Sequence, residues 1–207
     1  MSERYLITQS LLSAWNWIYS APEGWEESAF ESFMQTLRRE PTERNDAMQN
    51  GLDFEAECYR QAAGLPRDPH EKWEPGILAI AENIKGAATQ VKASCDIEVS
   101  GRKFLLYGIL DALKAGQIYD IKFSTKPLSS SFEYGKYLGS AQHPAYLRIV
   151  PEADRFTYLV SDGTDVCAET YSRNETQPIE GIIDDFISSM ERIGFLELYR
   201  EKWLAKQ

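Results

Sequence analysis

The chain of 207 residues is long enough to bury one substantial core, and we expect a single domain over residues 1–207. Its content of 43% hydrophobic and 12% aromatic residues is typical of a folded protein and excludes a disordered chain. A net charge of −10 argues against a broad electrostatic grip on nucleic acid, which normally requires a basic excess.

The distribution of charge along the chain is uneven. Between residues 100 and 150, seven basic residues stand against three acidic ones, a local excess of four positive charges. The average charge therefore conceals a local reversal of sign.

The sequence suggests neither a targeting segment nor a paired cysteine site. "MSERYLITQS" has no long apolar run behind its charges, and no stretch approaches the roughly 18 apolar residues of a membrane span. We therefore expect a cytoplasmic protein without a membrane partner. Cys58, Cys95 and Cys167 lie far apart without CxxC spacing, so we expect buried free thiols rather than disulfides or structural zinc.

Apolar residues at helical spacing predict four helices in the first half of the chain. They cover about residues 8–19, 27–39, 47–63 and 75–84, and Thr8 or Ser10 can cap the first. Pro41 with the polar run "TERND", and later "GLPRDP", interrupt this pattern.

After residue 84 the pattern changes to the alternation of strands. Residues 93–125 predict a three-stranded antiparallel meander with turns at 100–101 and 115–116. A helical or loop-then-helix segment over about 130–150 follows, and then two strands around the turn Asp162-Gly163. A long amphipathic helix over 179–205 closes the chain. The predicted fold is mixed α/β or α+β, with a helix inserted into the sheet region.

The hairpin "GILDALKAGQIYDIKFST", residues 108–125, carries two aspartates and a lysine within strand-forming sequence. Strand alternation puts Asp120 and Lys122 on one face. The opposite face carries side chains that can pack into a core, namely Tyr119, Ile121 and Phe123.

The turn decides which residues face each other across this hairpin. A two-residue turn at 115–116 places Asp111 opposite Asp120, where like charges destabilise the pair. A divalent cation such as Mg²⁺ would offset that repulsion, and the nearby Lys122 could hold or help deprotonate a metal-activated water. Two alternatives stay open: the charges coat a solvated face, or a three-residue turn breaks the pairing, since Ala115 is not a favoured residue for a primed turn.

Further motifs accompany the hairpin in a definite order. "GLDFEAE" places Gly51 four residues before Glu55, and "QHPAY" places Gln142 and Tyr146 one helical turn apart. Gly-x-x-Asp, eight residues and Asp-x-Lys lie between them. The chain thereby resembles the RecB-type branch of the PD-(D/E)XK nuclease superfamily, which includes phage-type exonucleases of recombination and DNA repair.

The resemblance extends over about residues 8–165 and carries expectations for fold and function. It implies a restriction-endonuclease-like core, in which helices flank a central mixed β-sheet, with N-terminal helices and a long C-terminal helix. It implies a metal-dependent DNA nuclease acting as an exonuclease on single- or double-stranded ends. Alternatives are a structure-specific endonuclease and a catalytically silent nucleic-acid-binding or interaction domain. A homo-oligomer or a recombination partner protein is a further option.

The resemblance also implies a metal site. Asp111 and Asp120 would ligate Mg²⁺ or Mn²⁺, the carbonyl of Ile121 would be a further ligand, and Glu55 would bind directly or through water. The alternative for Glu55 is an ordinary solvated helix glutamate.

Further residues would act on the water and the substrate. Lys122 would position or activate the attacking water, and Gln142 and Tyr146 would orient that lysine or a substrate phosphate. Tyr146 could equally be a core aromatic with its hydroxyl at the surface. Candidate phosphate contacts, or else solvated cations, are Lys126, Lys136 and Arg148.

Two departures from the family pattern carry their own predictions. Ala21-Pro22 stands where iron–sulfur members have Cys-Pro, and four cysteines are not available, so we expect no iron–sulfur cluster. Pro144 falls between Gln142 and Tyr146, and a proline inside a helix would kink it. We therefore expect the helix to begin near Gln142, with Pro144 in its first turn.

Overall fold

A computed structural model describes residues 3–205, so the outermost limits of the predicted domain, residues 1–2 and 206–207, lie outside the described residues. The strands are β1 (Arg4–Thr8), β2 (Ala88–Val99), β3 (Arg102–Lys114), β4 (Gln117–Phe123), β5 (Arg155–Ser161) and β6 (Val166–Ser172). The helices are α1 (Gln9–Ser20), α2 (Glu26–Arg38), α3 (Asp46–Ala62), α4 (Glu74–Ile84), α5 (Leu128–Ser131), α6 (Gln142–Ile149), α7 (Ile179–Arg192) and α8 (Leu196–Lys202).

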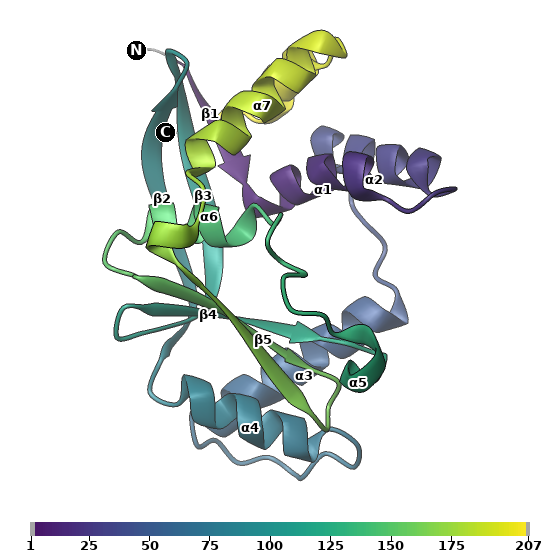
Figure 1. The fold of residues 1–207 in the computed structure, drawn as a ribbon, viewed down its shortest axis with the longest axis vertical. Helices are drawn as coiled ribbons and strands as arrows, with labels where there is room; N and C mark the ends of the chain where they lie inside the picture. Colours follow the sequence, from purple (N-terminus) through teal and green to yellow (C-terminus); the bar gives the residue numbers. More distant parts are fainter. Residues whose placement is uncertain (1–2, 206–207) are drawn as a thin grey trace.

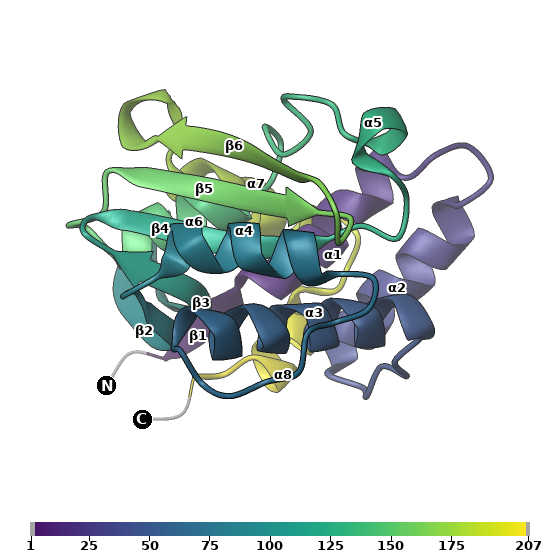
Figure 2. The same cartoon turned by 90° about the horizontal axis from the view of Figure 1, so that it is seen from below.

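The strands form one mixed sheet with helices on both faces. The order is β1-β3-β4-β5-β6, and β2 pairs with β3. In Figure 1, α3 and α4 lie together beside β4 and β5, whereas α1, α2 and α7 lie at the opposite end of the molecule. Figure 2 shows α3 and α4 side by side across one face of the sheet. The predicted mixed α/β architecture with flanking helices is confirmed.

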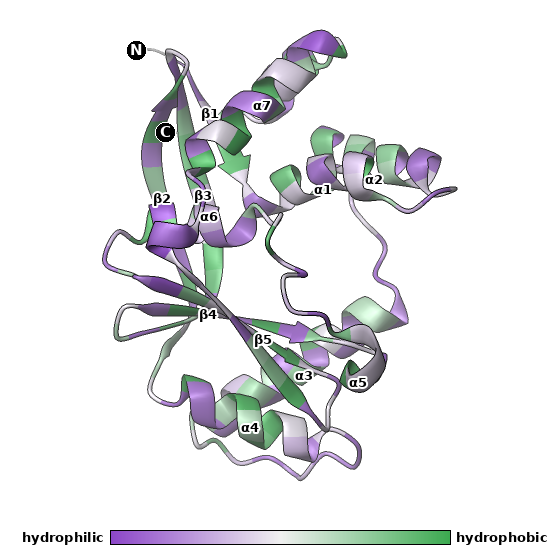
Figure 3. Cartoon of the chain, in the orientation of Figure 1, coloured by the Kyte–Doolittle hydropathy of each residue, from purple (hydrophilic) through white to green (hydrophobic). Residues whose placement is uncertain are grey.

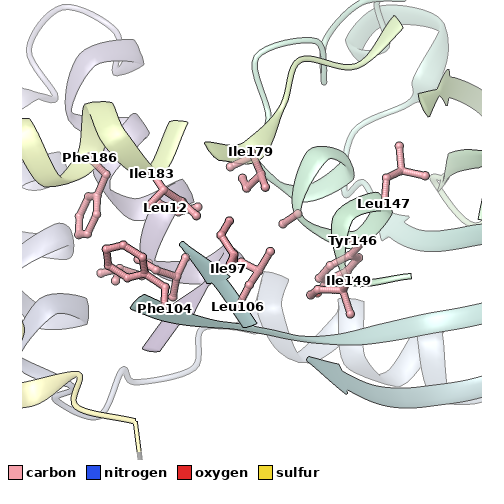
Figure 4. Packing of buried hydrophobic residues seen from close by; sticks show 14 of the residues in the cluster. Leu12, Ile97, Phe104, Leu106, Tyr146, Leu147, Ile149, Ile179, Ile183 and Phe186 are labelled. Carbon is pink, nitrogen blue, oxygen red and sulfur yellow. The ribbon is translucent and has the colours of Figure 1, made fainter. Parts of the chain in front are cut away.

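Two hydrophobic clusters occupy the two faces of the sheet. The smaller one joins α3 and α4 to the sheet through residues such as Phe54, Ile80 and Ile121. In the larger one, Phe104 of β3 lies near Phe186 of α7 (Figure 4). Hydrophobic and hydrophilic residues are interspersed along α4 and α7 in Figure 3, as expected of amphipathic helices that each cover one face of the sheet.

The predicted meander and its register are confirmed. In the turn between β3 and β4, Ala115 has φ 49° and Gly116 has φ 77°, so both adopt the left-handed conformation of a two-residue primed turn. The β3–β4 ladder pairs Lys114 with Gln117 and ends at Ala112 opposite Tyr119. The turn therefore tolerates Ala115 at a position where alanine is disfavoured, and the alternative of a three-residue turn is wrong.

Two predicted boundaries differ from the structure. The closing helix predicted over 179–205 is two helices, because α7 ends at Arg192 and Gly194 (φ 79°) turns the chain before α8. The strand β1 was not predicted. It has only five residues and pairs in parallel with the distant β3, so local sequence gives little signal for it. Among the free cysteines, Cys58 is buried as expected, whereas Cys95 and Cys167 are only half-buried.

The inserted segment between β4 and β5 follows the predicted loop-then-helix alternative. The helix α6 begins at Gln142, so Pro144 lies in its first turn, as predicted. Within residues 3–205, no helix combines the length and apolar content needed to cross a membrane.

Gly108 on β3 is required by close packing against α6. A Cβ at this position would lie 2.2 Å from Cε1 of Tyr146, which is buried at 6% exposure. We expect Gly108→Ala to lower the free energy of unfolding by about 1–3 kcal/mol, because the ring cannot retreat within a packed core. Urea denaturation measures this change.

The control is Gly181→Ala in the first turn of α7, where an added Cβ meets no atom within 4 Å. Its stability should be unchanged or raised by up to about 1 kcal/mol. A Gly108→Ala protein as stable as the wild type would contradict the packing argument.

Candidate functional site

The site lies at a gap along one edge of β3. The strand β2 occupies one edge over residues 102–113, so β1 and β4 must share the other. On that edge β1 pairs with residues 103–107 and β4 pairs with 112–114, which leaves 108–111 without a strand partner. The hydroxyl of Tyr146 donates to the Ile109 carbonyl at 3.0 Å within this gap. Backbone groups that β4 would normally bind are thus available to side chains.

Asp111 and Asp120 occupy the point where β3 and β4 separate. The register places them opposite each other, one step beyond the last regular pair. Instead of a continued ladder, the Ile121 N–H donates to Asp111 Oδ2 at 2.8 Å. Asp120 is only 2% exposed, so the alternative of a solvated charged face does not describe it.

Lys122 and Gln142 hold Asp120 from two directions. Lys122 Nζ lies 2.6 Å from Oδ2, and Gln142 Nε2 donates to Oδ1. Each oxygen of this buried carboxylate therefore has one polar partner, the Lys122 ammonium at Oδ2 and the Gln142 amide at Oδ1. Burial raises the pKa of Asp120 in spite of these contacts. For Lys122, burial lowers the pKa, but the attraction of Asp120 outweighs it and the net shift is upward.

Glu55 reaches the site from α3. Its Oε1 accepts from the Tyr59 hydroxyl at 2.5 Å and from Gln90 Nε2 at 2.8 Å. Burial raises the pKa of Glu55, the Tyr59 bond lowers it, and the negative charge of Asp120 raises it further. The Glu55 carboxylate therefore lies within electrostatic range of the aspartates.

The three acids repel one another in a partly desolvated setting. Burial, followed by the charges of Asp120 and Glu55, raises the pKa of Asp111 to about 8. Such a concentration of buried negative charge is stabilised by a cation.

The residues fit a hard divalent cation with few protein ligands. Within residues 3–205, no three His, Cys, Asp or Glu side chains are close enough to ligate one ion together. Mg²⁺, however, is usually bound through one or two carboxylates and several waters. The buried Asp120 carboxylate and the neighbouring Asp111 could supply such a pair, and Glu55 could act through water.

The residues of α6 have different environments. Gln142, at the first position of the helix, is buried and contacts Asp120 rather than Lys122. Tyr146 belongs to the larger hydrophobic cluster, as in the core alternative, but its hydroxyl donates to the Ile109 carbonyl instead of lying at the surface.

The predicted phosphate contacts are dispersed. Lys126 is exposed in the loop after β4. Lys136 lies with its Nζ 5.7 Å from the ring centroid of Tyr137. Arg148 is at the other end of α6 from Gln142, and its Nε donates to Glu180 Oε1 at 2.8 Å. The three cations therefore have separate surroundings, and Arg148 is already paired with Glu180.

Sequence reasoning missed several residues that contact the site. Tyr59 follows Glu55 by four positions on one helix, a spacing that could have indicated the pair. Tyr137 stacks on Tyr158 at 4.1 Å between ring centroids, and its pKa is raised by burial and lowered by the charge of Lys122. Gln90 gave no sequence signal, because its position depends on an unusual backbone conformation in β2.

Comparison with known proteins gives a fold but no family. No family model and no curated protein matches the chain. The solved structure of SSO0001 has a TM-score of 0.53 at 12% identity, over 93% of this chain and 79% of that chain. The structure of LHK-Exo in complex with dAMP has a TM-score of 0.50 at 15% identity, over 95% and 92%. The mixed sheet flanked by helices is consistent with the predicted restriction-endonuclease-like fold.

The raised pKa of Asp111 predicts a pH-dependent cost to stability. Below about pH 4 the carboxyl is neutral in the folded and unfolded chain and costs nothing. Between about pH 4 and about pH 8 the unfolded chain has released this proton while the folded chain still binds it, so the free energy of unfolding falls as the pH rises and levels off above about pH 8. Asp111→Asn should therefore melt at the wild-type temperature near pH 4 and above it at pH 9, in buffer containing EDTA.

Differential scanning calorimetry of both proteins across this range measures the effect. Asp53→Asn, at an exposed position of α3, serves as the control and should show no such growing difference. An Asp111→Asn protein that is less stable than the wild type at pH 9 would show that the ionised Asp111 carboxylate does not destabilise the folded protein.

Proposed function

We propose that the protein is a nuclease that hydrolyses DNA phosphodiester bonds with Mg²⁺ or Mn²⁺, and that it acts as an exonuclease. The observation that carries this proposal is the buried Asp120 carboxylate, which faces Asp111 across the split hairpin and has Lys122 Nζ 2.6 Å away. Two acids with a lysine beside them match the needs of phosphoryl hydrolysis, in which a water must be oriented and negative charge stabilised.

The cation would be held by oxygen ligands of the hairpin. Asp111, Asp120 and the carbonyl of Ile121 would bind it directly, and Glu55 would bind through water. A bound divalent ion supplies a water of lowered pKa and stabilises charge on the phosphate. Gln142 fixes Oδ1 of Asp120, so Oδ2, which Lys122 contacts in this structure, would be the oxygen offered to the cation.

Lys122 would act on the water and on the phosphate. Its side chain is only half-buried and its ammonium contacts Asp120, so it could also donate to a water or a phosphate oxygen there. A cation held by Asp120 would compete with Lys122 for that carboxylate, which would leave the ammonium free to contact the water or the phosphate. Tyr146 supports this arrangement from the core by filling the gap beside Gly108.

The DNA backbone would approach across the loop after β4 and the segment before α6. Lys126 and Lys136 lie on these segments and would contact phosphates. The loop carrying Lys136 is tied to β6, because the buried Glu169 accepts from the Gly135 N–H at 3.0 Å. For Arg148 to contact DNA as well, its ion pair with Glu180 would have to open.

The exonuclease mode is supported by the structural neighbour LHK-Exo, an exonuclease by its name, whose structure contains dAMP. A nucleoside monophosphate is what an exonuclease releases from a DNA end. A structure-specific endonuclease would instead cut circular DNA, so parallel digestion of linear and circular substrates separates the two modes.

A second candidate function is a nucleic-acid-binding or interaction domain without catalysis. Two observations favour it. The net charge is −10, and within residues 3–205 no three His, Cys, Asp or Glu side chains are close enough to bind one metal ion together. It predicts that Asp120→Ala leaves the function intact.

We expect Lys122→Ala to reduce cleavage of end-labelled linear DNA in Mn²⁺ by about 100-fold or more, because charge stabilisation by one group is typically of this size. Gel analysis of the labelled products gives the rate. The exposed Lys103→Ala, on the neighbouring strand β3, serves as the control and should cleave at the wild-type rate.

The nuclease proposal fails if the wild type degrades neither single-stranded nor double-stranded DNA and binds no divalent cation. It also fails if Lys122→Ala and Lys103→Ala cleave equally well. Cleavage of linear but not circular DNA would support the exonuclease mode.

A further inference from the structure

Glu55 is held by a closed set of three hydrogen bonds. Oε1 of Glu55 accepts from Tyr59 Oη at 2.5 Å and from Gln90 Nε2 at 2.8 Å. Gln90 Nε2 also donates to Tyr59 Oη at 2.9 Å. We call Tyr59 and Gln90 the Glu55 clamp. Both bonds to the carboxylate end on the same oxygen, which leaves Oε2 as the oxygen available to a ligand.

The clamp joins two elements that flank the acidic pair. Glu55 and Tyr59 are one turn apart on α3, whereas Gln90 is on β2. Phe54, next to Glu55, is fully buried and fixes the position of α3 against the sheet. Packing therefore sets where the helix lies, and the clamp sets where the Glu55 carboxylate points.

The backbone of Gln90 has an unusual conformation for a residue within a strand. Its φ is 53°, in the left-handed region that a residue with a side chain adopts at a cost of about 1–2 kcal/mol. The β2–β3 ladder pairs Thr89 with Ala112 and Val91 with Leu110, and it omits the pair between Gln90 and Asp111. Gln90 thus lies opposite Asp111, at the point where the sheet is already interrupted.

Local strain of this kind persists where surrounding structure demands it and is concentrated at functional sites. In an ordinary strand conformation the Gln90 side chain would follow the regular alternation of β2. The strained residue is the one whose amide reaches Glu55, so the strain and the contact have one explanation.

We propose that Tyr59 and Gln90 are positioning residues that hold Oε1 of Glu55, direct Oε2 toward the cation of Asp111 and Asp120, and thereby raise the affinity for that cation. This inference rests on the proposed function, because it requires a cation at the acidic pair. Groups that orient metal ligands from outside the coordination shell typically change metal affinity by about 10–100-fold.

The test is Mn²⁺ affinity by isothermal titration calorimetry, for the wild type, Tyr59→Phe and Gln90→Gly. Tyr59→Phe removes one hydroxyl. Gln90→Gly removes the amide, and it also relieves the positive φ, because glycine adopts this conformation without steric cost. We expect each variant to bind Mn²⁺ about tenfold or more weakly than the wild type.

Melting temperatures measured in EDTA separate positioning from general damage. Gln90→Gly should melt at or above the wild-type temperature while it loses affinity, a combination that a purely structural role would not give. The matched control is Gln49→Ala. Gln49 makes the same kind of bond on the same helix, from its Nε2 to Asp53 Oδ1 at 2.8 Å, and its loss should leave the affinity unchanged.

Each outcome decides the inference. Weaker binding in both clamp variants, with stability retained and Gln49→Ala normal, supports it. Wild-type affinity in the clamp variants overturns the clamp and leaves the proposed nuclease standing. No Mn²⁺ binding by the wild type overturns the clamp, and if the wild type also cleaves no DNA it overturns the proposed nuclease as well. Equal weakening in Gln49→Ala, or a loss of affinity that follows a matching loss of stability in both variants, shows that the clamp has no positioning role.

Discussion

The burial of two like-charged carboxylates at a split in the sheet is the constraint on which the site depends. Asp111 and Asp120 face each other where water cannot screen them fully, and burial raises the pKa of both. The surrounding contacts each reduce that cost. The Ile121 N–H, the ammonium of Lys122 and the amide of Gln142 all contact the pair. The remaining repulsion is what would make the site bind a cation.

The topology of the sheet creates the space for this pair. Because β1 and β4 share one edge of β3 and leave residues 108–111 between them, the backbone there is open to side chains. The helix α6 fills the gap from the larger hydrophobic cluster. Its Tyr146 packs on Gly108, and its Gln142 reaches Asp120. One short helix therefore contributes to both the core and the site. Gly108, the first residue of the Gly-x-x-Asp motif, is required because the ring of Tyr146 packs against its backbone.

Much of this arrangement could be predicted from local sequence. Alternation gave the strands of the hairpin, and counting from the turn gave the opposition of Asp111 and Asp120. Pro144 indicated where α6 starts, because a proline is excluded from the interior of a helix.

The strand β1 could not be predicted in this way, because its five residues form a strand only through their pairing with the distant β3. The break at Gly194 was masked by apolar periodicity that continues on both sides of it. The contact of Gln90 with Glu55 could not be predicted either, because it depends on the positive φ of Gln90. The burial of Asp120 depends on α6, a long-range contact.

The central claim is that Asp111 and Asp120 bind one divalent cation between them. Crystals soaked in Mn²⁺ and measured at a wavelength where manganese scatters anomalously test this most directly. We predict one anomalous peak at coordination distance, about 2.0–2.2 Å, from an oxygen of each aspartate. An empty position between the two carboxylates at saturating Mn²⁺, with both side chains ordered as in this structure, would contradict the account.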